Sequence, residues 1–219
     1  MAGGVKPKRR YDSTRRREQA AVTRREILEA AQELFAGQGY AATTITAIAS
    51  QAGVATKTVY LAFDTKSGLL RALWNLLLRG DEGEAPVAQR AWYREVLEEP
   101  DPEEKLRLNA RNARAVKERI GTVLGVIREA AAADPDSAAL WDRIQTEFHE
   151  NQSKIVESLE QMGSLRPGLD AATAADVLWT LNHPDVWQIL VGRRGWTPAR
   201  WEEWFADASC QQLLSGPGV

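Results

Sequence analysis

Residues 44–66 read TITAIASQAGVATKTVYLAFDTK, and this stretch decides the fold of the chain. Two short apolar patterns with helical spacing flank Gly53. They consist of Ile45, Ile48, Ala49 and Ala52 before it and of Val54, Val59, Ala62 and Phe63 after it. Because glycine reaches a positive φ without steric cost, Gly53 suits a sharp turn between two helices. The pattern is typical of a helix-turn-helix, whose second helix lies in the DNA major groove.

The charge of the chain is distributed unevenly, although the formal net charge of the 219 residues is only −2. Residues 1–25 carry nine basic and two acidic side chains, whereas residues 80–219 carry 15 basic and 24 acidic ones. A basic N-terminus on an acidic body favours binding of a polyanion at that end. A solubilising tail is the alternative, and we expect residues 1–22 to be a largely disordered basic arm.

The cysteine content and the hydropathy of the chain indicate the cellular compartment in which we expect the protein. Cys210 is the single cysteine, which excludes an internal disulfide framework and suits a reducing compartment. The sequence has no apolar run of transmembrane length, and no signal-peptide pattern follows the basic N-terminus. The basic arm also lacks an apolar face for a membrane surface. We therefore expect a soluble, cytoplasmic protein without a membrane partner.

The segments around the helix-turn-helix complete a three-helix head over residues 23–65. A helix capped by Thr23, with Glu26 at the capping-box position, is expected to end near Gly37 and Gly39. Thr43 or Thr44 can cap the next helix, and such a cap is also a natural phosphate contact. The third helix, over about residues 55–62, turns Val59 and Phe63 inward. Its polar residues then face the groove or its walls: Thr56, Lys57, Thr58 and Tyr60.

Residues 23–79 resemble the DNA-binding domain of the TetR family of transcriptional regulators. The resemblance rests on the runs LFAGQGYAATTITAIASQAGV (34–54) and TKTVYLAFDTKSGLLRAL (56–73). It implies an all-α fold, in which a fourth helix over residues 66–79 joins the head to a larger helical bundle. That bundle, within residues 66–219, would bind a ligand and form a homodimer.

The same resemblance implies which side chains contact DNA. These would be Thr44, Thr56, Lys57, Thr58, Tyr60 and Lys66, with Arg15, Arg16 and Arg17 as an arm on the DNA backbone or minor groove. Ala62 departs from the family pattern, because many members carry a larger polar or aromatic residue there. We expect the basic arm to compensate for the phosphate contact that Ala62 cannot make.

The remaining sequence predicts further helices with clear start signals. Residues 86–98 are expected to be helical, and Asp101-Pro102 begins a helix with a break between about residues 117 and 121. Asp134, Asp170 and Thr197 cap later helices. Residues 165–204 also resemble regulatory domains of a TetR subgroup common in actinobacteria. By analogy with the family, we expect the helices over residues 137–162 and 170–182 to form the dimer interface, with the C-terminal segment assisting.

The sequence offers no persuasive catalytic, cofactor or metal site. His149 and His183 are the only histidines, and no Cys or acidic partner stands at metal-ligand spacing from them. No phosphate-binding glycine loop, nucleophile elbow or paired-acid motif is present. We therefore expect a protein that is not an enzyme and uses no cofactor.

Eight tryptophans lie outside the first three expected helices. Most aromatic residues at helical spacing belong to a core, but a ligand pocket between helices is apolar with a few polar groups. Our candidate pocket residues are Trp92, Trp141, Phe148, Trp179 and Asn182. Gly121 and Gly125 share a helix face, and we favour close helix packing there over room for a ligand.

The features together predict a sequence-specific DNA-binding regulator. We expect a repressor that binds a palindromic operator as a homodimer and responds to a small apolar or amphipathic ligand. One alternative is a DNA-binding regulator without a ligand, which an empty or fully packed C-terminal core would favour. Another is a helical enzyme or partner-binding protein that has kept the head, which a cleft with converging titratable groups would favour.

Overall fold

The computed structural model describes residues 13–79 and 87–215. They form helices joined by short turns: α1 (Ser13–Ala42), α2 (Ile45–Gln51), α3 (Thr56–Phe63), α4 (Lys66–Arg79), the 3-10 turn η1 (Val87–Gln89), α5 (Ala91–Glu98), α6 (Pro102–Ala131), α7 (Pro135–Gln161), α8 (Ala171–Leu181), α9 (Pro184–Trp187), the π-helical turn η2 (Gln188–Arg193) and α10 (Pro198–Leu213). Within the described residues there is one isolated β-bridge, Leu165–Leu214, and no strand. The all-α prediction is confirmed.

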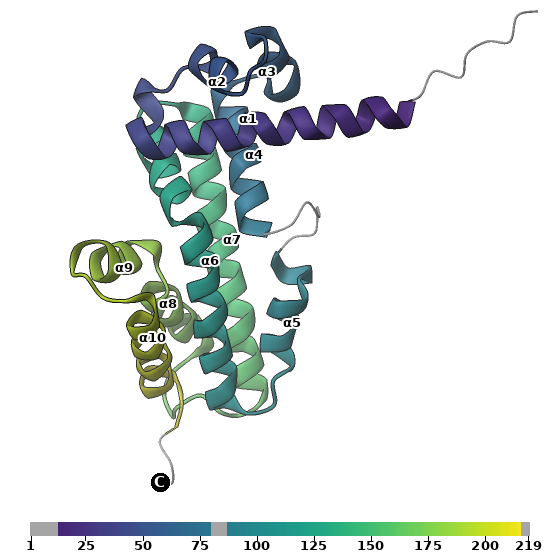
Figure 1. Cartoon of the computed structure of the whole chain (residues 1–219). Helices are drawn as coiled ribbons and strands as arrows, with labels where there is room; N and C mark the ends of the chain where they lie inside the picture. Colours follow the sequence, from purple (N-terminus) through teal and green to yellow (C-terminus); the bar gives the residue numbers. More distant parts are fainter. Residues whose placement is uncertain (1–12, 80–86, 216–219) are drawn as a thin grey trace, which may run out of the picture.

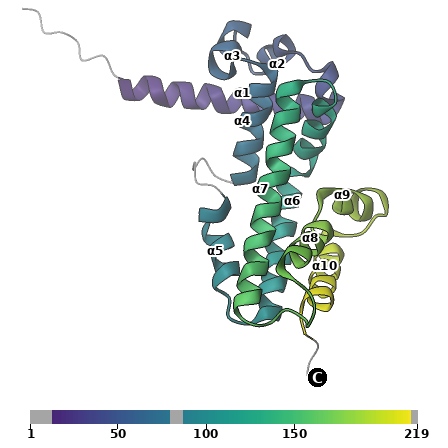
Figure 2. The same cartoon turned by 180° about the vertical axis from the view of Figure 1, so that it is seen from behind.

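The molecule is elongated, with the head at one end of two long helices. In Figure 1, α2 and α3 lie at the top, α6 and α7 run down the body, and α8, α9 and α10 gather beside their lower half. Figure 2 shows the same arrangement from behind, with α5 on the opposite side of the body from α10. The first half of α1 projects beyond the body in both views.

Helix α1 begins ten residues earlier than the sequence analysis predicts. The expected disorder of residues 1–22 is wrong for residues 13–22, because this segment is helical. Its sequence lacks Gly and Pro and is rich in arginine, glutamate, glutamine and alanine, which are good helix formers. The predicted end is confirmed, since Gly39 interrupts the helix with φ +76°. The rest of the basic arm and the connection at residues 80–86 lie outside the described residues.

The start signals of the body helices are confirmed, with two corrections of extent. The side chains of Asp101, Asp134, Asp170 and Thr197 each accept a backbone N–H of the helix that follows. The predicted break at residues 117–121 is wrong, because α6 runs unbroken through Gly121. Burial of the flanking apolar side chains offsets the roughly 1 kcal/mol that a glycine costs inside a helix. The helix expected over residues 86–98 is confined to α5, which begins at Ala91.

The core is continuous from the head into the body. One buried cluster joins Ile27 and Phe35 of α1 with Ile48, Val59 and the fully buried Leu69, Leu70 and Leu73 of α4, and it extends to Ile127 of α6. A second cluster lies among α5, α6, α7, α8 and α10 and includes Trp201 and Phe205. Helix α4 is thus packed in the same buried cluster as the head.

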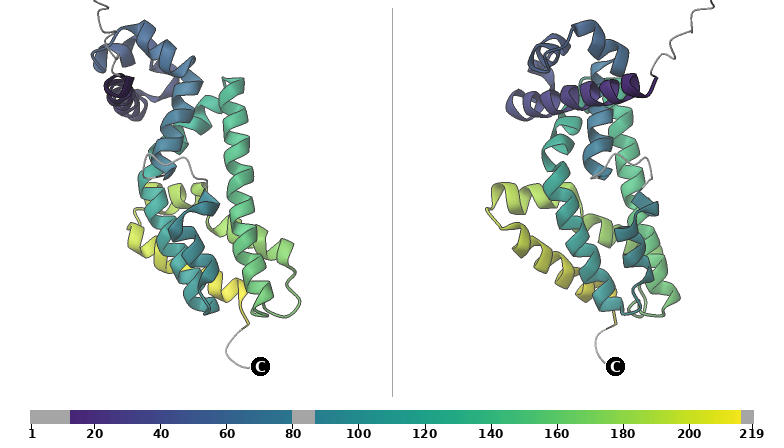
Figure 3. Two further views of the ribbon diagram at one scale, coloured as in Figure 1. Left: turned by 90° about the vertical axis from the view of Figure 1, so that its right-hand side faces the viewer. Right: turned by 45° about the vertical axis from the view of Figure 1, so that its right-hand side comes forward.

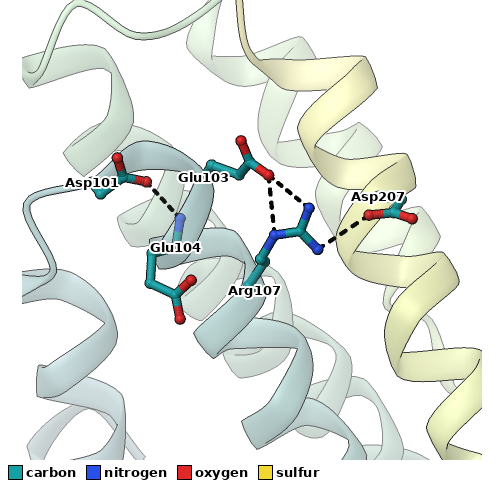
Figure 4. A network of polar contacts seen from close by, with 5 residues as sticks. All are labelled: Asp101, Glu103, Glu104, Arg107 and Asp207. Atoms are coloured by element: carbon teal, nitrogen blue, oxygen red, sulfur yellow. Dashed lines mark hydrogen bonds and ion pairs between the residues drawn. The ribbon is translucent and has the colours of Figure 1, made fainter.

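Surface ion pairs connect α6 to α10 at the end of the body farthest from the head. Figure 4 shows Arg107 between Glu103 of its own helix (Nη2–Oε1, 2.6 Å) and Asp207 of α10 (Nη1–Oδ1, 3.2 Å). The same view shows Asp101 capping α6 through the backbone N–H of Glu104. These groups are exposed, so we assign them no large share of the stability.

In the described part of the chain, no helix is both long and apolar enough to cross a membrane.

Candidate DNA-binding surface and ligand cavity

The turn between α2 and α3 has the geometry that the sequence predicts. Gly53 adopts φ +67°, in the left-handed region that glycine reaches without strain. Ala49 and Val59 are buried on either side of the turn, with 1% and 0% of their surfaces exposed. Their burial places α3 across α2, so one face of α3 is packed and the other faces solvent.

Helix α3 carries four of the nine predicted contact residues. Lys57 is exposed, Tyr60 has 52% of its surface exposed, and Thr56 and Thr58 are half-buried. Leu61 was missed by the sequence analysis, although 79% of its surface is exposed beside Tyr60. An exposed leucine on a recognition helix can make apolar contact with a thymine methyl group. The sequence indicates Leu61 because it is an apolar residue outside the buried positions of α3.

The two threonines before α2 have different roles. Thr44 is exposed and caps α2, since its hydroxyl accepts the N–H of Ala47 at 3.1 Å. Thr43 is buried, and its hydroxyl donates to the carbonyl of Gly39 at 2.8 Å. Of these two threonines, only Thr44 is therefore accessible to a phosphate.

The position of Ala62 is tied to α1 through its backbone. Arg24 donates from Nη1 to the carbonyl of Ala62 at 2.8 Å, and its guanidinium lies over the ring of Phe63 at 4.2 Å. This contact joins the projecting half of α1 to the end of the recognition helix. Arg15, Arg16 and Arg17 are exposed farther along that half of α1.

Lys66 lies against the head. Its ammonium donates to the carbonyl of Tyr40 and sits 4.0 Å from the centre of the Tyr40 ring, and burial lowers the pKa of Lys66. The Tyr40 hydroxyl in turn donates to Asp134 at the start of α7, at 2.7 Å. Burial and the hydrogen bond to Asp134 raise the pKa of Tyr40, so the phenol stays protonated and donates. Head, α4 and α7 thus meet in one polar contact.

A cavity of about 150 Å³ lies in the body between α4, α5, α6, α7 and the α8–α9 turn. Figure 3 shows these helices from two further sides. Four of the five candidate pocket residues line the cavity, namely Trp92, Trp141, Phe148 and Asn182. Trp179 does not line it, because its ring packs edge-on against His149 and His183.

The two glycines of α6 give room to this cavity. Both Gly121 and Gly125 line it, and a Cβ at Gly125 would meet no other atom within 4 Å. A Cβ at Gly121 would meet only Trp187 Nε1, at 3.9 Å. The expectation that these glycines permit close helix packing is therefore wrong. The fully packed core that would favour a regulator without a ligand is not what the body shows.

Lys117 is a cavity residue that the sequence analysis missed. Only 7% of its surface is exposed, and its ammonium donates to Asn182 Oδ1. Within the described residues, no carboxylate oxygen lies within 4 Å of it. Burial lowers the pKa of Lys117 to about 7. The signal in the sequence is a lysine at an apolar position of the α6 period, between Ala113 and Ile120.

The described residues contain no group of three His, Cys, Asp or Glu side chains that could hold a metal ion. His183 caps α9, where its Nδ1 accepts the N–H of Asp185, and burial lowers its pKa. His149 pairs with Asp176 on the surface at 2.8 Å.

A helix-turn-helix head on a helical body defines the class of the protein as a DNA-binding transcriptional regulator. Residues 27–73 match the family model described as bacterial regulatory proteins, tetR family. Comparison with curated protein sequences gave no match. The helix-turn-helix head is thus similar in sequence to the DNA-binding domain of the TetR family.

Solved structures share the fold over nearly the whole chain. NalD, described as the secondary repressor of the MexAB-OprM multidrug efflux pump in Pseudomonas aeruginosa, is 24% identical with a TM-score of 0.66; the match covers 90% of this chain and 98% of that one. A SmeT–triclosan complex is 20% identical with a TM-score of 0.70, over 90% and 96% of the two chains. FadR from Bacillus subtilis, in complex with stearoyl-CoA, is 20% identical with a TM-score of 0.69, over 86% and 98%.

Proposed function

We propose that the protein is a repressor that binds a palindromic operator as a homodimer and is released by a small apolar or amphipathic ligand. The observation that carries the proposal is that α4 contributes Trp74 and Leu78 to the cavity, while its first residue, Lys66, contacts Tyr40 of the head. A ligand in the cavity would therefore touch the helix that supports the recognition helix. The three solved structures above include complexes with triclosan and with stearoyl-CoA.

The DNA contacts in this proposal lie on one end of the molecule. Lys57 and Tyr60 offer an ammonium and a hydroxyl on the exposed face of α3, and Thr44 offers its hydroxyl at the start of α2. Thr56 and Thr58 flank them, and Lys66 with Arg15, Arg16 and Arg17 completes the set. Side chains of these kinds donate to base edges and phosphates. Such a regulator works beside the chromosome, in the cytoplasm.

Dimerisation supplies the affinity that one head lacks. A single helix-turn-helix contacts one half-site, so two related heads about one helical turn of DNA apart are needed. We assign the interface to the exposed faces of α7 and α8, with the C-terminal segment assisting. Size-exclusion chromatography with light scattering tests the assignment, and a monomer at micromolar concentration contradicts it.

Control by a ligand requires different affinities for two states of the regulator. If the cavity binds ligand more tightly when the heads are badly spaced for DNA, occupancy lowers operator affinity. Coupling free energies of this kind are about 1–3 kcal/mol, or roughly 5- to 150-fold in affinity. A ligand with equal affinity for both states would change nothing.

The DNA-binding part is tested with an operator selected from a random duplex library on the full-length protein. We expect Lys57→Ala and Tyr60→Phe each to weaken the selected site by roughly tenfold, because each loses a base or phosphate contact of about 1–3 kcal/mol. Arg119→Ala removes an exposed basic side chain of α6, outside the helices assigned to the dimer interface, and is the matched control, with unchanged affinity expected. Selection of no sequence, or equal loss in the control, contradicts the proposal.

A further inference from the structure

The cavity has a polar composition that points to the chemistry of its ligand. Its apolar part combines aliphatic side chains with aromatic ones from α4, α5, α7 and α9, namely Trp74, Trp92, Trp141, Phe148 and Trp187. Its polar part contains N–H donors that lack acceptors. Asn109 is 93% buried, and its Nδ2 has no hydrogen-bond partner; the same holds for Gln145 Nε2.

Lys117 is the strongest of these donors. An ammonium has three N–H groups, and the structure gives this one a single acceptor, the neutral amide oxygen of Asn182. The rings of Trp201 and Phe148 lie 4.9 and 5.7 Å from its nitrogen, so aromatic faces surround the remaining N–H groups. A buried ammonium without an anion is costly, because desolvation is not offset by a charge partner.

The other charged groups of the cavity do not satisfy Lys117. Asp185 pairs with Arg128 of α6. Glu147 of α7 also lines the cavity, but it is exposed to solvent. The Nδ1 of His183 accepts the N–H of Asp185, so its Nε2–H donates to Gln145 Oε1 at 3.2 Å. This contact uses the oxygen of the Gln145 amide and leaves its N–H groups without an acceptor. The buried part of the cavity therefore has an excess of donors and of positive charge.

We propose that the cavity binds an amphipathic ligand with one anionic oxygen group, a carboxylate in the simplest case, and that this group pairs with Lys117 while the apolar body packs on the tryptophans. The inference rests on the proposed function, because it takes the cavity as the effector site. An anionic oxygen supplies the acceptor that the ammonium lacks. Charge-assisted hydrogen bonds of this kind are about twice as strong as neutral ones.

Matched probes that differ only in their head group test the proposal. Octanoate, 1-octanol and octylamine are titrated into the full-length protein by isothermal calorimetry, together with 4-phenylbutanoate and its alcohol and amine. We expect both carboxylates to bind roughly tenfold or more tightly than their alcohols, and the amines to bind worst. Equal binding of carboxylate and alcohol overturns the proposal, as does failure of both carboxylates to bind below millimolar concentration.

Variants separate a direct contact from a structural role. Lys117→Met keeps the length of the side chain and should weaken both carboxylates roughly tenfold or more while leaving the alcohols within about twofold. Arg119→Met changes the net charge equally at an exposed site of α6 and should leave all affinities unchanged. Unchanged carboxylate binding in Lys117→Met overturns the proposal.

Proton uptake on ligand binding distinguishes a lysine that pairs with the ligand from a lysine with only a structural role. Because the pKa of Lys117 is about 7 in the empty cavity, the amine is mostly neutral at pH 8 and must take up a proton to pair with a carboxylate. Calorimetry in buffers of different ionisation enthalpy should give an uptake of about one proton per octanoate in the wild type and none in Lys117→Met. Other titratable groups near Lys117 stay constant between the two proteins: His183, Asp185, Glu147 and Arg128.

Failure of the proposed function is distinguishable from failure of this inference. Octanoate that binds with the expected charge preference but leaves operator affinity unchanged contradicts ligand control of DNA binding and leaves the assignment of Lys117 standing. If carboxylates and alcohols bind equally and both release DNA, ligand control of DNA binding stands and the assignment of Lys117 is contradicted.

Discussion

Two lysines of α6 are buried, and they differ in how many of their N–H groups find acceptors. Lys105 donates to the carbonyls of Val96 and Leu97, at 3.1 and 2.7 Å, and to the hydroxyl of Ser158, at 2.8 Å. It thereby joins α5, α6 and α7 at the lower end of the body. Lys117 has only Asn182 as a hydrogen-bond acceptor. Burial lowers the pKa of both lysines, but Lys105 has the acceptors of a structural residue and Lys117 does not.

Replacing Lys117 by methionine should stabilise the protein in a pH-dependent manner. Since the pKa of Lys117 is lowered to about 7 in the folded state and is near 10.5 in the unfolded state, the unfolded chain binds more protons between these values. Wild-type stability therefore rises with pH across this window, relative to Lys117→Met. The free energy of unfolding of Lys117→Met should exceed that of the wild type most below pH 7, and the difference should shrink toward pH 10.

Denaturant unfolding of both proteins at equal protein concentration, from pH 6 to pH 10, measures this difference. Groups that are common to both proteins cancel in the comparison. A difference in free energy of unfolding that stays constant over the whole range would show that Lys117 does not titrate as the structure indicates.

At the scale of the helix, α4 and α6 connect the cavity to the head. Helix α4 lines the cavity with Trp74 and Leu78 and is buried in the head's own cluster through Leu69, Leu70 and Leu73. Helix α6 faces it across the cavity with Gly121 and Gly125, where larger residues would fill the space. The separation of these two helices is therefore the variable that a ligand would change.

Gly125→Leu should imitate a bound apolar ligand. The new side chain enters open space, and leucine is a better helix former than glycine by roughly 1 kcal/mol, so the thermal stability should be kept or raised. Operator affinity should fall by roughly 5- to 150-fold if the cavity controls the head. The control is Gly125→Ala, which gives most of the gain in helix propensity with little filling. If both variants bind the operator like the wild type, the cavity is not coupled to the head.

For the whole molecule, charge and shape favour one orientation on DNA. The head and the projecting half of α1 carry exposed basic side chains at one end, whereas residues 80–219 are net acidic. Arg24 connects this half of α1 to the carbonyl of Ala62 at the end of α3. That the basic arm compensates for the missing side chain at Ala62 stays a prediction. Residues 13–22 are helical, so the arginines of this part of the arm extend from a helix.

Exchange of Arg15, Arg16 and Arg17 for glutamine should change the salt dependence of operator binding more than its sequence preference. Each lost phosphate contact lowers the magnitude of the slope of log K against log salt by about 0.9. The matched control exchanges three exposed arginines of the body, Arg119, Arg193 and Arg194, and should leave the slope unchanged. Equal slopes in all three proteins would remove the arm from the DNA interface.

The sequence by itself determined the helices and the head, because these depend on neighbours within one or two turns. Capping residues such as Asp134 and Thr197, the turn at Gly53 and the spacing of Ala49 and Val59 act locally, so their pattern is readable without a fold. The same local rules failed at Gly121, where burial of the neighbouring side chains outweighed the cost of glycine inside a helix.

Only the tertiary structure decided what each buried face meets. The sequence offered Trp92, Trp141, Phe148 and Trp179 as pocket candidates, but helical spacing could not tell a cavity from a packed contact. That distinction depends on the separation of α4, α6 and α7, which are joined through residues far apart in the chain. The burial of Lys117 without an anion has the same origin, because the desolvation of its ammonium comes from several elements at once.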